Sequence, residues 1–182
     1  MKYKILIILV FVCLFYNAQI LPLRTYTDIP ENAYLKDTNN ELESYEGTWK
    51  GTWDNKTILV TFKKVTNQYN DNLKYFKDYI IGKFKVIDSN GNVLFNNTNA
   101  TDNFAKIRGS RIRKADDKYS LIYNDFDLCN TSGNIIINFT DSSRTKLNWN
   151  LYFGSNMITS DCQYYNTDIP DSLPEEITLT KQ

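Results

Sequence analysis

Short segments in which every second residue is apolar recur from residue 57 to the end of the chain. In the clearest, residues 145–153, leucine, tryptophan and phenylalanine alternate with lysine, asparagine and tyrosine. Strict alternation is typical of a β-strand with one buried face and one solvated face, because successive side chains point to opposite sides. The same pattern predicts strands at residues 57–63, 79–87, 134–139 and 177–180. No segment sustains the 3.6-residue period of an amphipathic helix, so we predict an all-β protein.

Turn signals separate these segments. Asn90-Gly91 lies between two apolar stretches and predicts a tight hairpin, because both residues tolerate a positive φ. The asparagine-containing residues 65–77 favour a loop over a short helix. About eight to ten strands at near-regular spacing indicate a sandwich or a barrel. We predict a single antiparallel β-barrel in which the last strand pairs with the first, because closure removes exposed strand edges.

The apolar faces of the predicted strands supply the barrel interior, and Phe153 is expected to face inward with them. The expected lining is Ile58, Val60, Phe62, Ile80, Phe84, Leu147, Trp149 and Leu151. An eight-stranded barrel is just wide enough to be filled by such side chains or to hold one small ligand. Bulky residues at nearly every inward position favour a filled interior and a binding or interaction role for the surface. Carriage of a small apolar ligand inside the barrel is the alternative.

The sequence predicts three parts of the chain. Residues 1–18 are a signal peptide, residues 19–44 form an extended lead-in, and residues 45–182 form the barrel. Lys2 and Lys4 precede an apolar run over residues 5–16, and Ala18 is a small residue at a plausible cleavage point. The run is shorter than the roughly 20 residues that span a bilayer, which favours a cleaved signal over a retained anchor. We therefore expect an exported protein, periplasmic or secreted, with no membrane span after cleavage.

Two cysteines remain after such a cleavage, Cys129 and Cys162. In an oxidising compartment, two cysteines are expected to form a disulfide. The alternative of a reactive thiol is less favoured, because the chain has no histidine and no C-x-x-C pair to lower a thiol pKa.

Composition removes several classes of function. The 182 residues suit one domain, and 21 basic residues against 21 acidic ones argue against a nucleic-acid-binding protein. The absence of histidine excludes Ser-His-Asp and Cys-His catalytic groups and imidazole zinc sites. Neither G-x-x-x-x-G-K-S/T nor G-x-G-x-x-G occurs, so we expect no nucleotide cofactor.

Asp125 and Asp127 share a strand face and would suit a carbohydrate-active hydrolase, but a solvated strand end is the favoured interpretation. The chain is therefore expected not to be an enzyme.

Surface positions suggest partners. Arg111 and Arg113 alternate onto one face of a strand, where they could bind an anion. Alternatively, they form a solvated face or a charged edge strand that resists pairing with another chain. Tyr164 and Tyr165 combine flat rings with hydroxyl groups, which suits contact with a sugar or a protein. Asp171-Ser172-Leu173 resembles an O-glycosylation site of exported bacterial proteins. The sequence leaves the partner open, and a glycan, a lipid and an envelope protein are the candidates.

Two resemblances to known families add to this picture. Gly47 and Trp49 on the first barrel strand resemble the G-x-W signature of lipocalins and other calycin-type barrels, which implies a tryptophan packed across one barrel end and often an apolar ligand. Residues 21–23, 28–34, 36–37, 40–42, 45 and 47–49, with the late cysteine pair and the terminal Thr180-Lys181-Gln182, are similar to a family of small exported Bacteroidota proteins of unknown function. That second resemblance implies export and leaves the activity open.

Overall fold

The structure, a computed structural model, describes residues 19–156 and 158–182, so the signal peptide predicted at residues 1–18 lies outside the described residues. Regular elements over the described part are strands and three short 3-10 helices. In chain order they are β1 (Ile20–Pro22), β2 (Tyr34–Lys36), η2 (Glu43–Tyr45), β3 (Gly47–Trp53), β4 (Lys56–Asn70), β5 (Tyr75–Ile87), β6 (Val93–Asn96), η3 (Asp102–Phe104), β7 (Ile107–Ile112), β8 (Tyr119–Asp125), η4 (Phe126–Leu128), β9 (Thr131–Phe139), β10 (Lys146–Phe153) and β11 (Glu176–Lys181).

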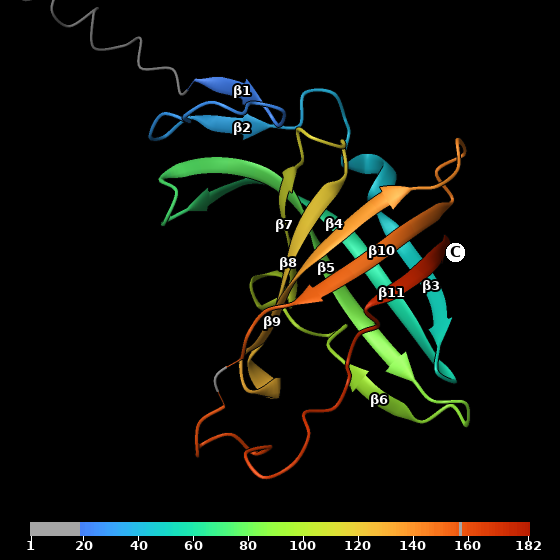
Figure 1. The fold of residues 1–182 in the computed structure, drawn as a ribbon. Helices are drawn as coiled ribbons and strands as arrows, with labels where there is room; N and C mark the ends of the chain where they lie inside the picture. Colours follow the sequence, from blue (N-terminus) through green and yellow to red (C-terminus); the bar gives the residue numbers. More distant parts are fainter. Residues whose placement is uncertain (1–18, 157) are drawn as a thin grey trace, which may run out of the picture.

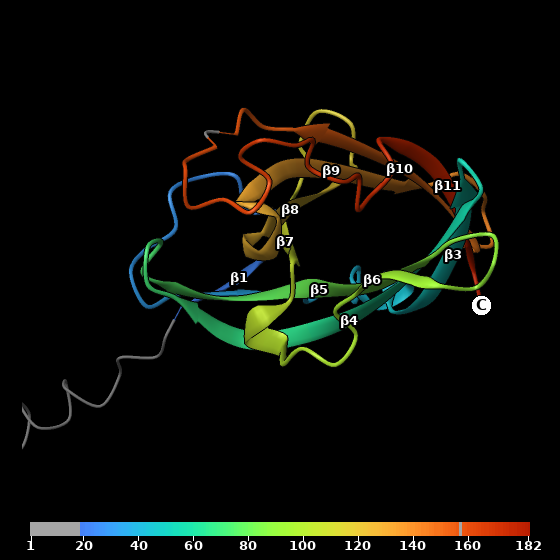
Figure 2. The same ribbon diagram turned by 90° about the horizontal axis from the view of Figure 1, so that it is seen from below.

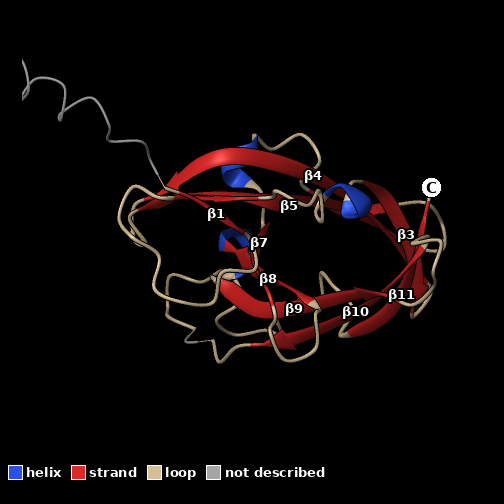
Figure 3. Cartoon of the chain, turned by 90° about the horizontal axis from the view of Figure 1, so that it is seen from above, coloured by secondary structure: helices blue, strands red, loops and turns tan. Residues whose placement is uncertain are grey.

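Eight of these strands close into an antiparallel barrel in the order β3, β4, β5, β7, β8, β9, β10, β11 (Figure 1). The last strand returns to the first barrel strand, with Thr180 opposite Lys50 and Lys181 opposite Trp49. Seen along its axis, the barrel is flattened, with β4 and β5 facing β9 and β10 (Figures 2 and 3). The prediction of an all-β fold with a single antiparallel barrel is confirmed.

One edge of β5 is covered by three strands in succession. β2 pairs with the start of β5 in parallel, with Tyr34 opposite Phe76. β7 closes the barrel at the middle of β5, with Ile81 opposite Arg108, and β6 pairs with its last residues. This division leaves little of the long β5 edge without a hydrogen-bonding neighbour, which protects it from pairing with another chain.

The loop prediction for residues 65–77 was wrong. β4 continues to Asn70 and β5 begins at Tyr75, so only a short turn separates two long strands. A β-bulge lies between Val65 and Gln68, where Asn67 adopts a φ of 53° and its N–H donates to Asp78 Oδ1 at 2.9 Å. Asparagine tolerates this left-handed conformation, so its presence marks a bulge as readily as a loop.

The hairpin at residue 91 forms, but with different turn chemistry from that predicted. Gly91 has a φ of 85°, whereas Asn90 is not among the residues with positive φ. The Asp88 carboxylate organises the turn instead, because its Oδ1 accepts hydrogen bonds from the N–H groups of Asn90 and Asn92, each at 2.8 Å. The hairpin is therefore formed by an Asp-anchored turn in which only Gly91 of the pair has a positive φ.

Large side chains fill the barrel. The eight residues expected to line the interior are at most 4% exposed, and they pack with Trp49, Tyr119, Tyr123 and Leu121 in one core. Phe153 is 40% exposed, contrary to expectation, because it is the last residue of β10, at the rim of the barrel.

Both ends of the barrel are covered. At one end, here called the hairpin end, strands are joined through residues 71–74, 113–118 and 140–145, and Leu23, Leu42 and Tyr45 from the N-terminal segment are buried against the core. At the other, the loop end, a short turn at residues 54–55 accompanies the three long connections, residues 88–106, 126–130 and 154–175. Residues 172–174 are buried there, and Trp149 Nε1 donates to Pro174 O at 3.0 Å. The long connections therefore gather at one end.

Substitution of Gly82 tests the closure of the barrel. A Cβ at this position would lie 2.9 Å from the Phe62 ring and 3.0 Å from Ile107 Cβ, so Gly82→Ala crowds the seam between β5 and β7. We expect the free energy of unfolding, measured with urea, to fall by about 1–3 kcal/mol. In the control Gly154→Ala, the nearest atom lies 3.3 Å away, and little change is expected. Equal stability of the two variants would contradict a tightly packed seam.

Candidate functional site

A groove of about 810 Å³ opens at the loop end, between the connection that carries η3 and the edge formed by β7, β8 and η4. Its volume is in the range of small-molecule binding sites, roughly 300–1,000 Å³. Three kinds of side chain line it: apolar Phe104, Ile122 and Phe126; the amides of Asn96, Asn97, Asn99, Asn103 and Asn124; and charged Lys106, Arg108 and Asp127. We call this surface the groove.

The apolar side chains of the groove are unusually exposed. Phe104 is 76% exposed, Phe126 74% and Ile122 53%. Ile122 on β8 and Phe126 on η4 are close in the sequence, and the fold brings Phe104 of η3 to the same hollow. Single exposed apolar residues are ordinary, but several gathered at one hollow mark an interaction surface.

Amide groups of the groove are largely free to bind a ligand. The side chains of Asn99, Asn103 and Asn124 make no hydrogen bond to any residue that the structure describes. Asn97 is nine-tenths buried; its Oδ1 accepts from the N–H of Phe84 at 2.5 Å, whereas its Nδ2 has no partner. Buried donors are nearly always satisfied, by protein, water or ligand.

The charged side chains of the groove all have partners within the chain. Lys106 Nζ lies 2.5 Å from Asp125 Oδ1 and 2.7 Å from Asp127 Oδ2. Burial opposes the charge on Lys106, but hydrogen bonds to the two carboxylates outweigh it and raise the lysine pKa. Arg108 donates to the Tyr79 hydroxyl and to the carbonyls of Asp102 and Asn103. Lys106 is thus balanced by carboxylates, whereas Arg108 is held by uncharged oxygen atoms alone.

Asp125 is completely buried, so the expectation of a solvated strand end was wrong for this residue. Its carboxylate accepts from Lys106, from the Tyr123 hydroxyl at 2.9 Å and from the N–H of Asp127 at 3.1 Å. The Tyr123 hydroxyl also hydrogen-bonds Ser172 Oγ at 2.7 Å, and burial is the main reason why the Tyr123 pKa is raised. Ser172, which resembles a glycosylation acceptor in sequence, is only 2% exposed in the folded chain.

The two carboxylates do not form a hydrolase site. Asp125 and Asp127 both bind the Lys106 ammonium group, and Asp125 is inaccessible, whereas glycoside hydrolysis needs two carboxyl groups that flank the substrate. In residues 19–156 and 158–182, no group of three or more potential metal-ligating side chains occurs.

η3 is held by a second set of ion pairs. Asp102 binds Lys63 of β4 at 2.6 Å and Lys83 of β5 at 2.8 Å, and these hydrogen bonds lower the Asp102 pKa to about 2. The carboxylate thus fixes the helix that carries Phe104 to two strands of the barrel wall.

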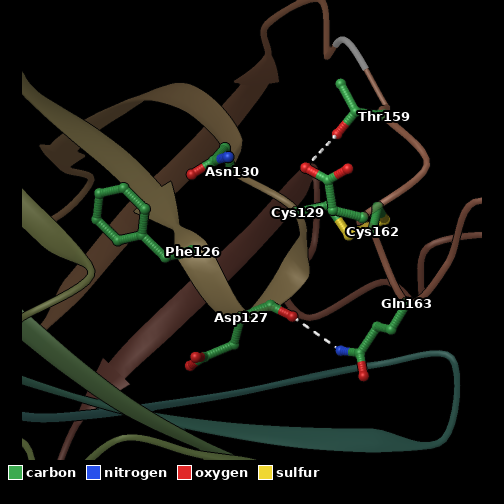
Figure 4. Close-up of a pocket in the computed structure, with 8 residues that line it drawn as sticks. Phe126, Asp127, Cys129, Asn130, Thr159, Cys162 and Gln163 are labelled. Carbon is green, nitrogen blue, oxygen red and sulfur yellow. Dashed lines mark hydrogen bonds between the residues drawn. A yellow bond between two sulfur atoms is a disulfide. The ribbon is translucent and has the colours of Figure 1, made fainter.

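The predicted disulfide, Cys129–Cys162, is present and lines a second hollow of about 320 Å³ (Figure 4). Gln163 Nε2 donates to the carbonyl of Asp127 at 3.0 Å, so the 154–175 connection is tied to η4 by a covalent bond and a hydrogen bond. In this view Phe126 points away from the sulfur atoms. The disulfide thus fixes the base of η4 while Phe126 faces the groove.

The surface residues expected from sequence lie at opposite ends. Arg111 is exposed and Arg113 pairs with Asp116 at 3.1 Å, both toward the hairpin end. Tyr164 is half-buried and Tyr165 is 55% exposed in the disulfide-bonded connection at the loop end. These four residues do not form one surface.

Sequence reasoning missed Phe104, Phe126 and the free asparagines. The available signal was an isolated aromatic residue in a polar connection, as in Asn103-Phe104 and Asp125-Phe126-Asp127.

Gly47 and Trp49 lie at the start of β3, toward the hairpin end. Trp49 is fully buried, its Nε1 donates to Tyr45 O at 2.8 Å, and Lys181 Nζ lies 5.4 Å from its ring centre. These contacts join η2, β3 and β11, where the barrel closes on its first strand.

Comparison with known families shows that residues 1–182 fit the model of a family of unknown function, DUF6705. The chain belongs to this family. Neither the search of curated proteins nor that of solved structures finds a match. In the described part of this DUF6705 protein, no helix is long and apolar enough to cross a membrane. The family brings no activity with it, so the function must be argued from the site.

Removal of the disulfide should destabilise this DUF6705 protein. The bond joins residues 33 apart, and closing such a loop reduces the entropy of the unfolded chain by an amount worth about 3–4 kcal/mol. We expect the free energy of unfolding of the Cys129→Ser/Cys162→Ser double variant, measured with urea, to be lower by that amount. The 154–175 connection of the variant should also be cleaved faster by protease. Unchanged stability and cleavage would show that the bond does not hold this connection.

Acidification should weaken the attachment of η3. The Asp102 pKa is lowered on folding, so its contribution to stability is complete above the ordinary value of 3.8 and is lost as the pH falls toward 2. Wild type should be more stable than Asp102→Asn in urea at pH 7, and the difference should shrink toward pH 2. Asp71→Asn, in the exposed turn at the hairpin end, is the control. A difference that does not depend on pH would refute the role of this carboxylate.

Proposed function

We propose that this chain is an exported, non-enzymatic binding module that holds its ligand in the groove. The observation that carries this proposal is the juxtaposition, on one hollow, of three exposed apolar side chains and three amides without partners. The groove is built on barrel strands and on connections held by ion pairs and a disulfide, so its shape exists before a ligand arrives. Preorganisation of this kind lowers the entropic cost of binding.

Carriage of an apolar molecule inside the barrel is less favoured. Trp49, Trp149, Phe62, Phe84, Tyr119 and Tyr123 occupy the interior, each at most 2% exposed. The hairpin end is covered by Leu42 and Tyr45, and the loop end by residues 172–174. Entry of a ligand would therefore require both displacement of core side chains and opening of an end.

Three features support export. The apolar run over residues 5–16 suits a cleaved signal peptide, and Cys129 and Cys162 form a disulfide, which is typical of oxidising compartments. The similarity to exported Bacteroidota proteins points the same way. A periplasmic or secreted location follows, with an envelope glycan, lipid or protein as the partner.

A carbohydrate-active hydrolase is less favoured, because the Lys106 ammonium group binds both candidate catalytic carboxylates, Asp125 and Asp127.

Nuclear magnetic resonance on the ¹⁵N-labelled chain distinguishes the groove from the interior. The probes are a fragment library of small neutral alcohols and amides, and separately a sixteen-carbon fatty acid. We expect fragments to shift the side-chain amide signals of Asn99, Asn103 and Asn124 and to leave the indole N–H signals of Trp49 and Trp149 unchanged, because both indoles are buried and hydrogen-bonded.

Variants locate the site. Phe126→Ala should weaken fragment binding by about tenfold, the effect of losing about 1.4 kcal/mol of contact. Tyr152→Ala removes a ring that is 59% exposed but lies outside the groove, and should have no effect. Indole shifts on addition of the fatty acid would establish interior carriage instead, and an absence of any shift at the groove would refute the proposal.

A further inference from the structure

The chemistry of the groove also identifies the class of its ligand. We infer that the groove binds a neutral oligosaccharide, an inference that rests on the groove being the binding site proposed above. The apolar, polar and charged side chains of the groove each exclude some classes of ligand.

Two flat rings are offered by different connections, Phe104 from η3 and Phe126 from η4. About three quarters of each is exposed, which costs solvation free energy unless a ligand covers it. A pyranose ring has one face made of C–H groups, which packs on a phenyl ring. Two rings on separate supports suit a chain of sugars better than a single one.

Much of the backbone along the groove is already hydrogen-bonded within the chain. The N–H groups of Asn97, Ala100 and Phe104 donate to carbonyls within the chain, as do those of Ala105 and Asn124. An extended peptide that added a strand would need free backbone groups, so this mode is disfavoured.

The free amides of Asn99, Asn103 and Asn124 each present donors and an acceptor. Sugar hydroxyls also donate and accept, so adjacent hydroxyls match such amides. Asn97 also lines the groove, and its buried Nδ2 is a donor without a partner that a bridging water could connect to a sugar hydroxyl.

The charges of the groove disfavour an ionic ligand. Lys106 is bound by two carboxylates, and Arg108 donates to the Tyr79 hydroxyl and two carbonyls. A phosphate, sulfate or uronic acid could reach the Lys106 charge only by displacing a carboxylate, and the Arg108 guanidinium is already held by three oxygen atoms. A wholly apolar ligand would leave the amides dehydrated and unpaired, at a cost in binding free energy. A neutral ligand rich in hydroxyl groups would leave the charge contacts intact and would pair the amides.

The test is an array of defined neutral oligosaccharides, of their sulfated and uronic-acid counterparts, and of peptides, followed by calorimetry on the best ligand. We expect the best ligand to be neutral and its affinity to change less than about twofold between 0.05 M and 0.5 M NaCl, because no charge pair forms. Phe126→Ala and, independently, Phe104→Ala should weaken binding about tenfold. Asn124→Ala should weaken it by a similar factor.

Matched controls are Tyr152→Ala for the rings and Asn72→Ala, in the turn at the hairpin end, for the amides; both should bind as wild type. The inference is overturned if the best ligand is anionic or a peptide, if no saccharide binds, or if affinity is unaffected by the groove variants. Fragment binding in the groove without saccharide binding would support the proposed function and reject this ligand class. An absence of binding in both assays would reject the proposed function and the ligand class together.

Discussion

The buried ion pair between Lys106 and Asp125 organises the functional end of the molecule. A carboxylate with 1% of its side chain exposed would be costly without a partner, so the lysine before β7 must stay next to the end of β8. The same carboxylate accepts from the first turn of η4 and from Tyr123, which hydrogen-bonds Ser172 in the last long connection. Three connections thus converge on one charge pair, and the positions of Phe126 and the floor of the groove follow from it.

This arrangement explains which features were visible in the sequence. Alternation of apolar and polar residues is a local signal, so strands such as β9 and β10 and the pairing of last strand with first were predictable. Burial of Asp125 was not, because the residue that makes it tolerable, Lys106, lies 19 positions away. The asparagines of residues 65–77 misled for another reason: the same tolerance of left-handed backbone that marks a loop also permits a bulge inside a strand, as at Asn67.

The groove was harder still to foresee. Phe104 and Phe126 each appear alone among polar residues, and only the return of β7 and β8 along the barrel wall brings their connections to one hollow. The Cys129–Cys162 disulfide, in contrast, was predictable from the number of cysteines and the expected compartment. The barrel interior gave the expected burial, and this packing assigns the barrel the role of a rigid support. In that role, the size of its core side chains determines stability and the connections determine what is recognised.

The groove and the first described residue lie at opposite ends of the barrel. Gln19 accepts a hydrogen bond from Tyr34 as β1 begins, so the folded body starts at once, with no spacer after residue 18. Any attachment through the N-terminus would therefore hold the barrel by its hairpin end. The recognition surface would then project outward, away from the anchoring plane, and would be accessible to large polymers as well as to small molecules.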